Sequence, residues 1–369
     1  MDILTLVLFL LGLGALIVGA EFLVRGASRL AAAMGVSPLV IGLTVVAYGT
    51  SSPEMAVSVL AALSGQADIT LGNVVGSNIF NVLFILGLSA LLVPLVVSRQ
   101  LVWLEVPLMV GVSLLLLLLA ADGTLSRLDG FVLFTGAVAY TLFAIYQSRK
   151  EGGGGEKEYA QEISENGLKA GGSLLTQIVS VVAGLALLVL GSRWLVNGAV
   201  AFAQSMGVSD FIIGLTIVAA GTSLPEIATS LLASLRGERD IAVGNVVGSN
   251  IFNILVVLGL SSVLAADGIP VPPAALRFDI PVMIAVAVAC LPIFFTGHLI
   301  ARWEGVLFFA YYVAYTAYLI LDAAQHDMLS FFSWVMMAFV VPLTLVTLMV
   351  GAVRSLRGLR SESTRAAER

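Results

Sequence analysis

The sequence predicts an all-α polytopic membrane protein with two inverted five-helix repeats, which give ten core membrane helices, and an eleventh helix near the C-terminus. Two observations support this prediction. The chain is 59% hydrophobic and 11% charged, with a mean hydropathy of +1.05, whereas soluble domains carry about 25% charged residues. The second observation is an internal repeat, because residues 72–81 and 244–253 both read GNVVGSNIFN.

The repeat extends upstream at the same offset of 172 residues. Residues 35–54 (GVSPLVIGLTVVAYGTSSPE) and 207–226 (GVSDFIIGLTIVAAGTSLPE) are identical at 14 of 20 positions without a gap. Each copy places a carboxylate, hydroxyls and a proline inside an apolar run, and the GNVVGSNIFN segment adds amides. A duplicated apolar unit with polar groups near its middle is typical of transporters whose site lies between two repeats.

Eleven apolar segments have about the 20 residues that a helix needs to span a bilayer. They are residues 3–30, 38–63, 71–97, 102–121, 129–148, 174–204, 210–235, 243–265, 279–297, 302–321 and 329–353. Between the fifth and sixth segments lies a long polar stretch with four consecutive glycines and mixed charges, which predicts a flexible, solvated linker. The isolated acidic residues Asp68, Glu105, Asp240 and Asp279 are expected at the membrane interface.

This division predicts four parts of the chain. Residues 1–148 form the first repeat, 149–173 a cytoplasmic linker, 174–321 the second repeat, and 322–369 the extra helix with a basic tail. With the N-terminus outside, 15 of the 18 lysines and arginines fall on the inner side, as the positive-inside rule requires. Because each repeat has an odd number of spans, the second starts on the opposite side from the first. We therefore expect a multi-pass protein of the cell (inner) membrane with a cytoplasmic C-terminus.

Each copy contains a proline that interrupts an apolar helix. Pro53 and Pro225 lack an N–H, so each frees the carbonyl four residues earlier, at Gly49 and Gly221. A free carbonyl in hydrocarbon is costly unless it lines a cavity or contacts a ligand. The hydroxyl side chains at this depth are Thr50, Ser51, Thr222 and Ser223. A kinked helix whose hydroxyls cap its own backbone is the simpler alternative.

Glu54 and Glu226 follow these prolines, near the middle of their spans. A charge at the bilayer centre costs at least a few kcal/mol, and neither span has a basic residue within helical reach. The two carboxylates therefore need a cation or a proton. Permanently protonated structural glutamates are the alternative.

The next helix of each repeat supplies hydroxyls and amides on one face, at Ser77, Asn81, Ser249 and Asn253. Its GxxxG pattern also predicts close helix packing, with polar side chains that hydrogen-bond between helices. We expect both features, with the glycines bringing these side chains to the cavity. The resulting oxygen-only inventory suits hard cations such as Ca²⁺, Na⁺ and K⁺. A site that holds either of two cations, but not both together, is the chemical basis of antiport.

Several other classes are excluded. A single cysteine and two histidines, His298 and His326, cannot build a Cys/His metal site, and neither histidine is placed to form a triad with Ser51 or Ser223. No basic patch with interleaved aromatics indicates nucleic-acid binding, and no nucleotide or cofactor motif is present. The chain is expected to be a transporter rather than an enzyme; a channel would conduct without demand for a counter-ion.

The motifs resemble the two α-repeats of the cation/calcium antiporter superfamily, and its sodium/calcium exchanger group in particular. GTSxPE followed by GSNxFN occurs twice, and the resemblance covers roughly residues 3–321. It implies ten core helices, of which the second, third, seventh and eighth surround the site. The first and sixth are implied to slide as a pair that alternates access.

The resemblance also implies ligands. For Ca²⁺ these are Glu54 and Glu226, with backbone oxygens of Thr50 and Thr222. For Na⁺ they are the carbonyls of Ala47 and Ala219, with Ser51, Ser77, Ser223 and Ser249, and Asn81 near the central site. Many exchangers carry an acid at the position of Asn253, so this chain has two intramembrane carboxylates rather than three or four. We therefore expect Ca²⁺ exchange for Na⁺ across the lipid bilayer, with H⁺-coupled exchange of Ca²⁺ or another cation as the alternative.

Overall fold

The computed structural model describes residues 3–151, 174–205, 219–295, 297–347 and 349. Within these ranges, nine helices are long and apolar enough to cross a membrane. They are Leu4–Met34, Ile69–Leu92, Leu101–Asp122, Arg127–Gln147, Leu174–Phe202, Arg239–Leu264, Ala275–Phe295, Arg302–Ala323 and Met328–Thr347. Residues 152–173 of the predicted linker, the basic tail from residue 350 and the first part of the seventh predicted span lie outside the described residues. Residues 149–151, expected in the linker, end a helix instead.

The second predicted span, residues 38–63, is a broken helix. It consists of α2 (Pro38–Ile41), the π-helix η1 (Gly42–Val46), α3 (Ala47–Thr50) and α4 (Ser52–Leu63). Ser51 separates the halves with φ −80° and ψ 11°. Pro53 lies in the first turn of α4, where its missing N–H costs nothing. The prolines therefore start a second helix instead of bending a continuous one.

The seventh predicted span has the same break. Here α12 (Ala219–Gly221) precedes α13 (Leu224–Leu235), with Pro225 in its first turn. Ser223, the counterpart of Ser51, has φ −89° and ψ 10°.

Two central helices follow the broken ones. The first comprises α5 (Ala67–Phe80), η2 (Asn81–Leu86) and α6 (Gly87–Leu92), and the second comprises α14 (Arg239–Phe252), η6 (Asn253–Leu258) and α15 (Gly259–Leu264). In both, the helix widens to a π turn that starts at the final asparagine of GNVVGSNIFN. The most apolar windows of these helices are 78% and 94% buried, against 39% or less for the other seven. They therefore form the centre of the protein.

The third span ends earlier than predicted, at Leu92 rather than residue 97. Pro94 follows, and residues 95 and 96 form a short strand, β1 (Leu95–Val96), which pairs with β4 (Leu299–Ile300) in the other repeat. A matching pair joins β2 (Thr124–Leu125) to β3 (Ile269–Pro270). These short strands were not predicted, because two-residue pairings leave no periodic signal.

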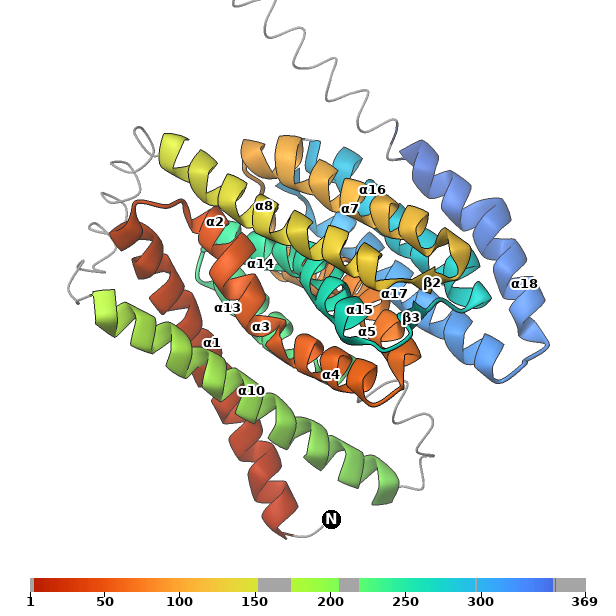
Figure 1. Ribbon diagram of the computed structural model, residues 1–369, viewed down its shortest axis with the longest axis horizontal. Helices are drawn as coiled ribbons and strands as arrows, with labels where there is room; N and C mark the ends of the chain where they lie inside the picture. Colours follow the sequence, from red (N-terminus) through yellow and green to blue (C-terminus); the bar gives the residue numbers. More distant parts are fainter. Residues whose placement is uncertain (1–2, 152–173, 206–218, 296, 348, 350–369) are drawn as a thin grey trace, which may run out of the picture.

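The first and sixth helices, α1 (Ile3–Met34) and α10 (Leu174–Ser205), cross each other at one side of the molecule (Figure 1). A Cβ atom on Gly12 would lie 2.8 Å from the carbonyl oxygen of Gly191, and one on Gly19 would lie 2.9 Å from that of Gly184. Moving along α1 from Gly12 to Gly19, the contacting residue on α10 changes from Gly191 to Gly184. The two helices therefore run antiparallel. They are counterparts in the repeat, so equivalent helices point in opposite directions.

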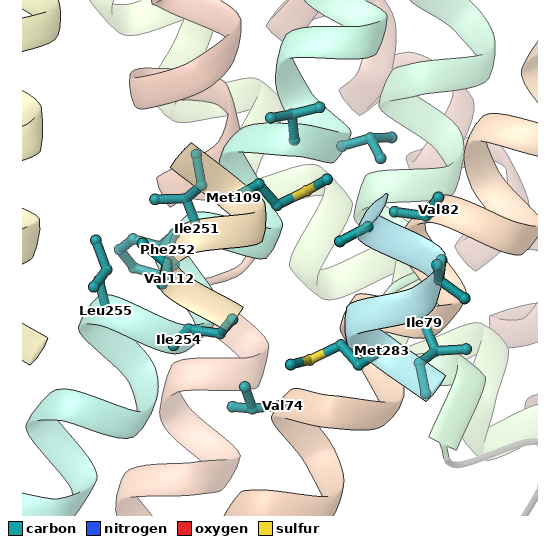
Figure 2. Packing of buried hydrophobic residues seen from close by; sticks show 14 of the residues in the cluster. Val74, Ile79, Val82, Met109, Val112, Ile251, Phe252, Ile254, Leu255 and Met283 are labelled. Carbon is teal, nitrogen blue, oxygen red and sulfur yellow. The ribbon is translucent and has the colours of Figure 1, made fainter. Parts of the chain in front are cut away.

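The remaining helices lie around the central pair. In chain order they are η3 (Leu101–Glu105), α7 (Val106–Leu119), η4 (Ala120–Asp122), α8 (Arg127–Glu151), η7 (Ala275–Asp279), α16 (Ile280–Phe295), α17 (Arg302–Ala323), α18 (Met328–Val335) and η8 (Met336–Val340). Of these, α18 is outermost, packed on α17 (Figure 1). Figure 2 shows part of the apolar core between them, including Met109 on α7, Met283 on α16 and Phe252 on α14. The protein is thus an all-helical, multi-pass membrane protein, and its described residues add two short strand pairs.

One acidic residue departs from its predicted place. Glu105, expected at the membrane interface, has none of its surface exposed. It accepts hydrogen bonds from Tyr140 Oη (2.9 Å) on α8 and Gln100 Nε2 (3.0 Å). In the second repeat, Tyr315 Oη on α17 donates to Asp279 Oδ1 (2.9 Å). Both acids end a π turn, so this pair of contacts is a second structural correspondence between the repeats.

Candidate cation site

The two broken helices exchange hydrogen bonds across the centre of the protein. Ser51 Oγ donates to Glu226 Oε1 at 2.8 Å, and Ser223 Oγ donates to Glu54 Oε1 at 2.9 Å. All four side chains are at most 1% exposed. Residues 172 apart in the sequence therefore make the same contact in opposite directions, and the carboxylates of both repeats meet in one place.

The helix breaks also explain how two carboxylates are tolerated here. Glu54 and Glu226 lie in the first turns of α4 and α13. The N-terminal end of a helix carries a partial positive charge and unpaired N–H groups, which stabilise a nearby anion. Breaking the span at Ser51 and Ser223 thus creates a favourable electrostatic position for each carboxylate at the middle of the membrane segment.

Several buried oxygens of the predicted site residues have no hydrogen-bond partner within the described residues. They are Oε2 of Glu54, Oε2 of Glu226, Oδ1 of Asn81, Oδ1 of Asn253, Oγ of Ser249 and Oγ1 of Thr222. An unpaired buried oxygen costs about 1–3 kcal/mol, and more when it is charged. These six oxygens of predicted site residues are two carboxylate, two amide and two hydroxyl atoms, and such an oxygen-only set suits a hard cation.

The remaining predicted residues lie in the same region. Thr50 Oγ1 is 3.4 Å from the carbonyl oxygen of Ala47 and donates at 3.1 Å to Asn245 Oδ1. Ser77 Oγ is 3.5 Å from Ser223 Oγ. Ala219 begins α12, and its carbonyl is the counterpart of the Ala47 carbonyl. The Ala47 carbonyl also accepts the Ser51 N–H at 3.0 Å, so it is shared with the helix backbone.

The freed carbonyl of Gly221 has its own partner. Ser192 Oγ on α10 donates to it at 2.6 Å. The proline therefore does free a carbonyl, as the sequence predicts, but a hydroxyl from the crossing helix caps it. This contact links α10 directly to the break in the seventh span.

The glycine pattern packs as expected in the second repeat. A Cβ on Gly248 would lie 2.5 Å from the Leu43 carbonyl oxygen, and one on Gly244 would lie 3.0 Å from that of Leu39. These contacts bring α14 against the first half of the broken second span. By the repeat, the counterparts of Leu39 and Leu43 are Phe211 and Leu215, which lie outside the described residues.

Sequence reasoning did not select Asn78 and Asn250, which connect the repeats. Asn81 Nδ2 donates to Asn250 Oδ1 at 3.0 Å, and Asn253 Nδ2 donates to Asn78 Oδ1 at 3.1 Å. The signal was available, because both residues are polar groups inside the repeated GNVVGSNIFN segment. Asn78 lies between the predicted ligands Ser77 and Asn81 in the sequence, and Asn250 lies between Ser249 and Asn253.

Asn73 and Asn245 brace the carboxylate helices. Asn73 Nδ2 donates to the Glu54 carbonyl (3.2 Å) and to Ser58 Oγ (2.9 Å). Asn245 Nδ2 makes the matching contact to Ser230 Oγ at 2.9 Å. An asparagine on α5 thus fixes the position of α4, and an asparagine on α14 fixes the position of α13.

Comparison with known proteins agrees with this architecture. The family described as "Sodium/calcium exchanger protein" matches residues 4–146 and 176–321. The chain is similar to "Putative antiporter CaxA" of Alkalimonas amylolytica, with 43% identity over 76% of this chain and 87% of that protein. It is 35% identical to "Sodium/calcium exchanger MaX1" of Methanosarcina acetivorans, over 84% of this chain and 96% of that protein.

Two further comparisons concern location and fold. "Inner membrane protein YrbG" of Escherichia coli is 39% identical over 76% of this chain and 86% of that protein. Solved structures of the sodium-calcium exchanger NCX_Mj superpose with a TM-score of 0.74 at 32% identity, over 86% of this chain and 99% of that one. The family match, the relatives and the fold agree with the crossed carboxylates, and the chain therefore belongs to the sodium/calcium exchanger family of membrane transporters.

Proposed function

We propose that this protein is a secondary antiporter that exchanges Ca²⁺ for Na⁺ at one site, which faces each side of the membrane in turn. The observation that carries the proposal is the crossed pair of buried carboxylates, each bound through one oxygen to a serine of the other repeat and with its second oxygen unpaired within the described residues. Two carboxylates neutralise one Ca²⁺. The surrounding neutral oxygens provide further positions for Na⁺.

Each predicted ligand has a role in this proposal. Glu54 and Glu226 bind Ca²⁺, with backbone oxygens of Thr50 and Thr222. Na⁺ takes oxygens from Ala47, Ala219, Ser51, Ser77, Ser223 and Ser249, while Asn81 and Asn253 contribute near the centre. Because the serines that bind Na⁺ include the two that hydrogen-bond to the Ca²⁺-binding carboxylates, the two cations compete for one space, and occupancy by one excludes the other. That exclusion couples the gradient of one ion to the movement of the other.

The antiparallel crossing of α1 and α10 supports alternating access. The two helices contact mainly each other, through glycines at Gly12, Gly19, Gly184 and Gly191, and they cross beside the broken spans. We propose that they slide as a pair between two positions. Residues 1–148 and 174–321 are then the two inverted repeats, joined by the cytoplasmic linker at 149–173.

The proposal also covers the two ends of the chain and the membrane in which the protein lies. Residues 322–369 add an eleventh membrane helix and a cytoplasmic basic tail, and the N-terminus lies outside. The name of the Escherichia coli relative supports placement in the inner membrane. The name of the Methanosarcina relative supports Na⁺ as the coupling ion.

The test is ⁴⁵Ca²⁺ uptake into proteoliposomes loaded with Na⁺ and diluted into Na⁺-free medium. Liposomes loaded with choline instead of Na⁺, and liposomes with an imposed pH gradient, serve as controls. We expect uptake that requires the outward Na⁺ gradient. Uptake that requires only the pH gradient would establish the H⁺-coupled alternative, and uptake under neither gradient would exclude Ca²⁺ as the substrate.

A further inference from the structure

Four asparagines form a closed set of hydrogen bonds where the two central helices face each other. Asn78 Nδ2 donates to the backbone carbonyl of Asn250, and Asn250 Nδ2 donates to that of Asn78, both at 3.2 Å. The side-chain oxygens of these two residues then accept from Asn253 and Asn81. All four side chains are at most 3% exposed.

The chemistry of these groups determines which way each amide points. A backbone carbonyl can only accept, so the group that faces it must be the NH₂ end of Asn78 or Asn250. Their oxygens therefore face Asn253 and Asn81, which must present their own NH₂ ends in return. As a result, Oδ1 of Asn81 and Oδ1 of Asn253 are turned away from this contact and have no partner within the described residues.

We propose that Asn250 and Asn78 are positioning residues, which turn the side-chain oxygens of Asn81 and Asn253 toward the transported cation. Each acts across the repeat boundary, because Asn250 orients Asn81 and Asn78 orients Asn253. Without the partner, the Asn81 amide can rotate and present its NH₂ end, which repels a cation. The inference rests on the proposed function, since it takes Asn81 and Asn253 as cation ligands.

Two methionines offer matched controls. Asn250 Nδ2 also lies 3.6 Å from Met109 Sδ, and Asn78 Nδ2 lies 3.6 Å from Met283 Sδ. Both methionines are labelled in the buried core of Figure 2 and are at most 2% exposed. Replacing either with leucine removes the sulfur contact at nearly constant volume and leaves the carbonyl contact that sets the amide.

The experiment is a double-mutant cycle on Na⁺ binding by the purified full-length protein. The probe is Na⁺ alone, titrated against choline, and the readout is the Na⁺ concentration that gives half of the rise in the thermal unfolding midpoint. The variants are Asn81→Ala, Asn250→Ala, the double variant and Met109→Leu. Removing a group that orients a metal ligand typically weakens metal affinity by about 10–100-fold.

We expect Asn81→Ala and Asn250→Ala each to raise the half-maximal Na⁺ concentration about tenfold or more, in line with that range. The double variant should match Asn81→Ala to within about twofold, and Met109→Leu should match the wild type, because coupled residues are non-additive. Full additivity, or an unchanged Na⁺ response in either single variant, would overturn the inference.

If Asn250→Ala does not fold, the symmetric cycle with Asn78→Ala, Asn253→Ala and Met283→Leu makes the same test. Because the assay measures binding, it separates this inference from the proposed function. If the Na⁺ titrations show the expected coupling but the protein fails to exchange Ca²⁺ for Na⁺, only the proposed function is wrong. If the protein exchanges the two ions but the effects of the two substitutions add, only the inference is wrong. A wild type that shows no Na⁺ response would contradict both.

Discussion

Ser51 in the first repeat donates a hydrogen bond to the carboxylate of Glu226 in the second, with 2.8 Å between Oγ and Oε1. Ser223 makes the reciprocal hydrogen bond to Glu54, so a serine of each repeat helps to position the carboxylate of the other repeat. Neither repeat makes these contacts by itself, because each carboxylate takes its serine from the other repeat. In the proposed site, the two copies must therefore meet before two carboxylates can face one cation.

Removing the charge of either glutamate should abolish Ca²⁺ transport. We expect Glu54→Gln and Glu226→Gln each to lower the initial rate of Na⁺-dependent ⁴⁵Ca²⁺ uptake at least about 100-fold, because one carboxylate cannot neutralise Ca²⁺. Glutamine keeps the volume and can still accept the serine hydrogen bond, so the protein should elute as a folded species in size-exclusion chromatography. Wild-type exchange in either variant would show that the site lies elsewhere.

Removing the crossed hydroxyls should weaken Ca²⁺ binding without abolishing it. A hydrogen bond to a charged group contributes about 1.5–3 kcal/mol, which is about tenfold or more in affinity. We expect Ser51→Ala and Ser223→Ala each to raise the KM for Ca²⁺ by about that factor. Ser113→Ala is the control, because buried Ser113 donates only to the Met109 carbonyl of its own helix at 2.8 Å. Equal effects from all three variants would argue against the crossed contact.

The glycine contact between α1 and α10 should tolerate no added methyl group. Gly12→Ala would place a Cβ 2.8 Å from the Gly191 carbonyl oxygen, whereas a Cβ on Gly14 meets no heavy atom within 4 Å. Overpacking of this kind typically costs about 1–3 kcal/mol. We expect Gly12→Ala to lower both the unfolding midpoint and the exchange rate, while Gly14→Ala changes neither. The two helices would not form a tight pair if the variants behaved alike.

The buried Glu105 contact should support stability rather than transport. Tyr140→Phe deletes the hydroxyl that donates to Glu105 Oε2 and leaves that buried oxygen unpaired, at a cost of about 1–3 kcal/mol. The midpoint of thermal unfolding in detergent should fall, and the KM for Ca²⁺ should stay unchanged. Tyr146→Phe is a matched control, because Tyr146 lies on the same helix and is 66% exposed. A drop of equal size in both variants would contradict the proposed role of the Glu105 contact.

Much of the fold was predictable because it depends on local patterns. The nine long helices of the described residues each overlap a predicted span, since long apolar runs are a strong signal. Helix ends were less predictable. The third span stops at Leu92 because residues 95 and 96 pair with a strand about 200 residues away in the chain, and Glu105 is buried because Tyr140 and Gln100 reach it. Such long-range contacts have no local signature.

Composition and identity at a fixed offset are enough to identify a duplicated membrane protein, with one glutamate, one proline and a group of hydroxyls and amides in each repeated segment. Three contacts emerge only from the folded chain. Ser51 contacts Glu226 rather than Glu54, Ser192 caps the Gly221 carbonyl, and the amides of Asn78 and Asn250 accept from Asn253 and Asn81. The physical reason is that a hydrogen bond depends on which atoms lie within about 3 Å of each other. That proximity is created when helices from the two repeats cross.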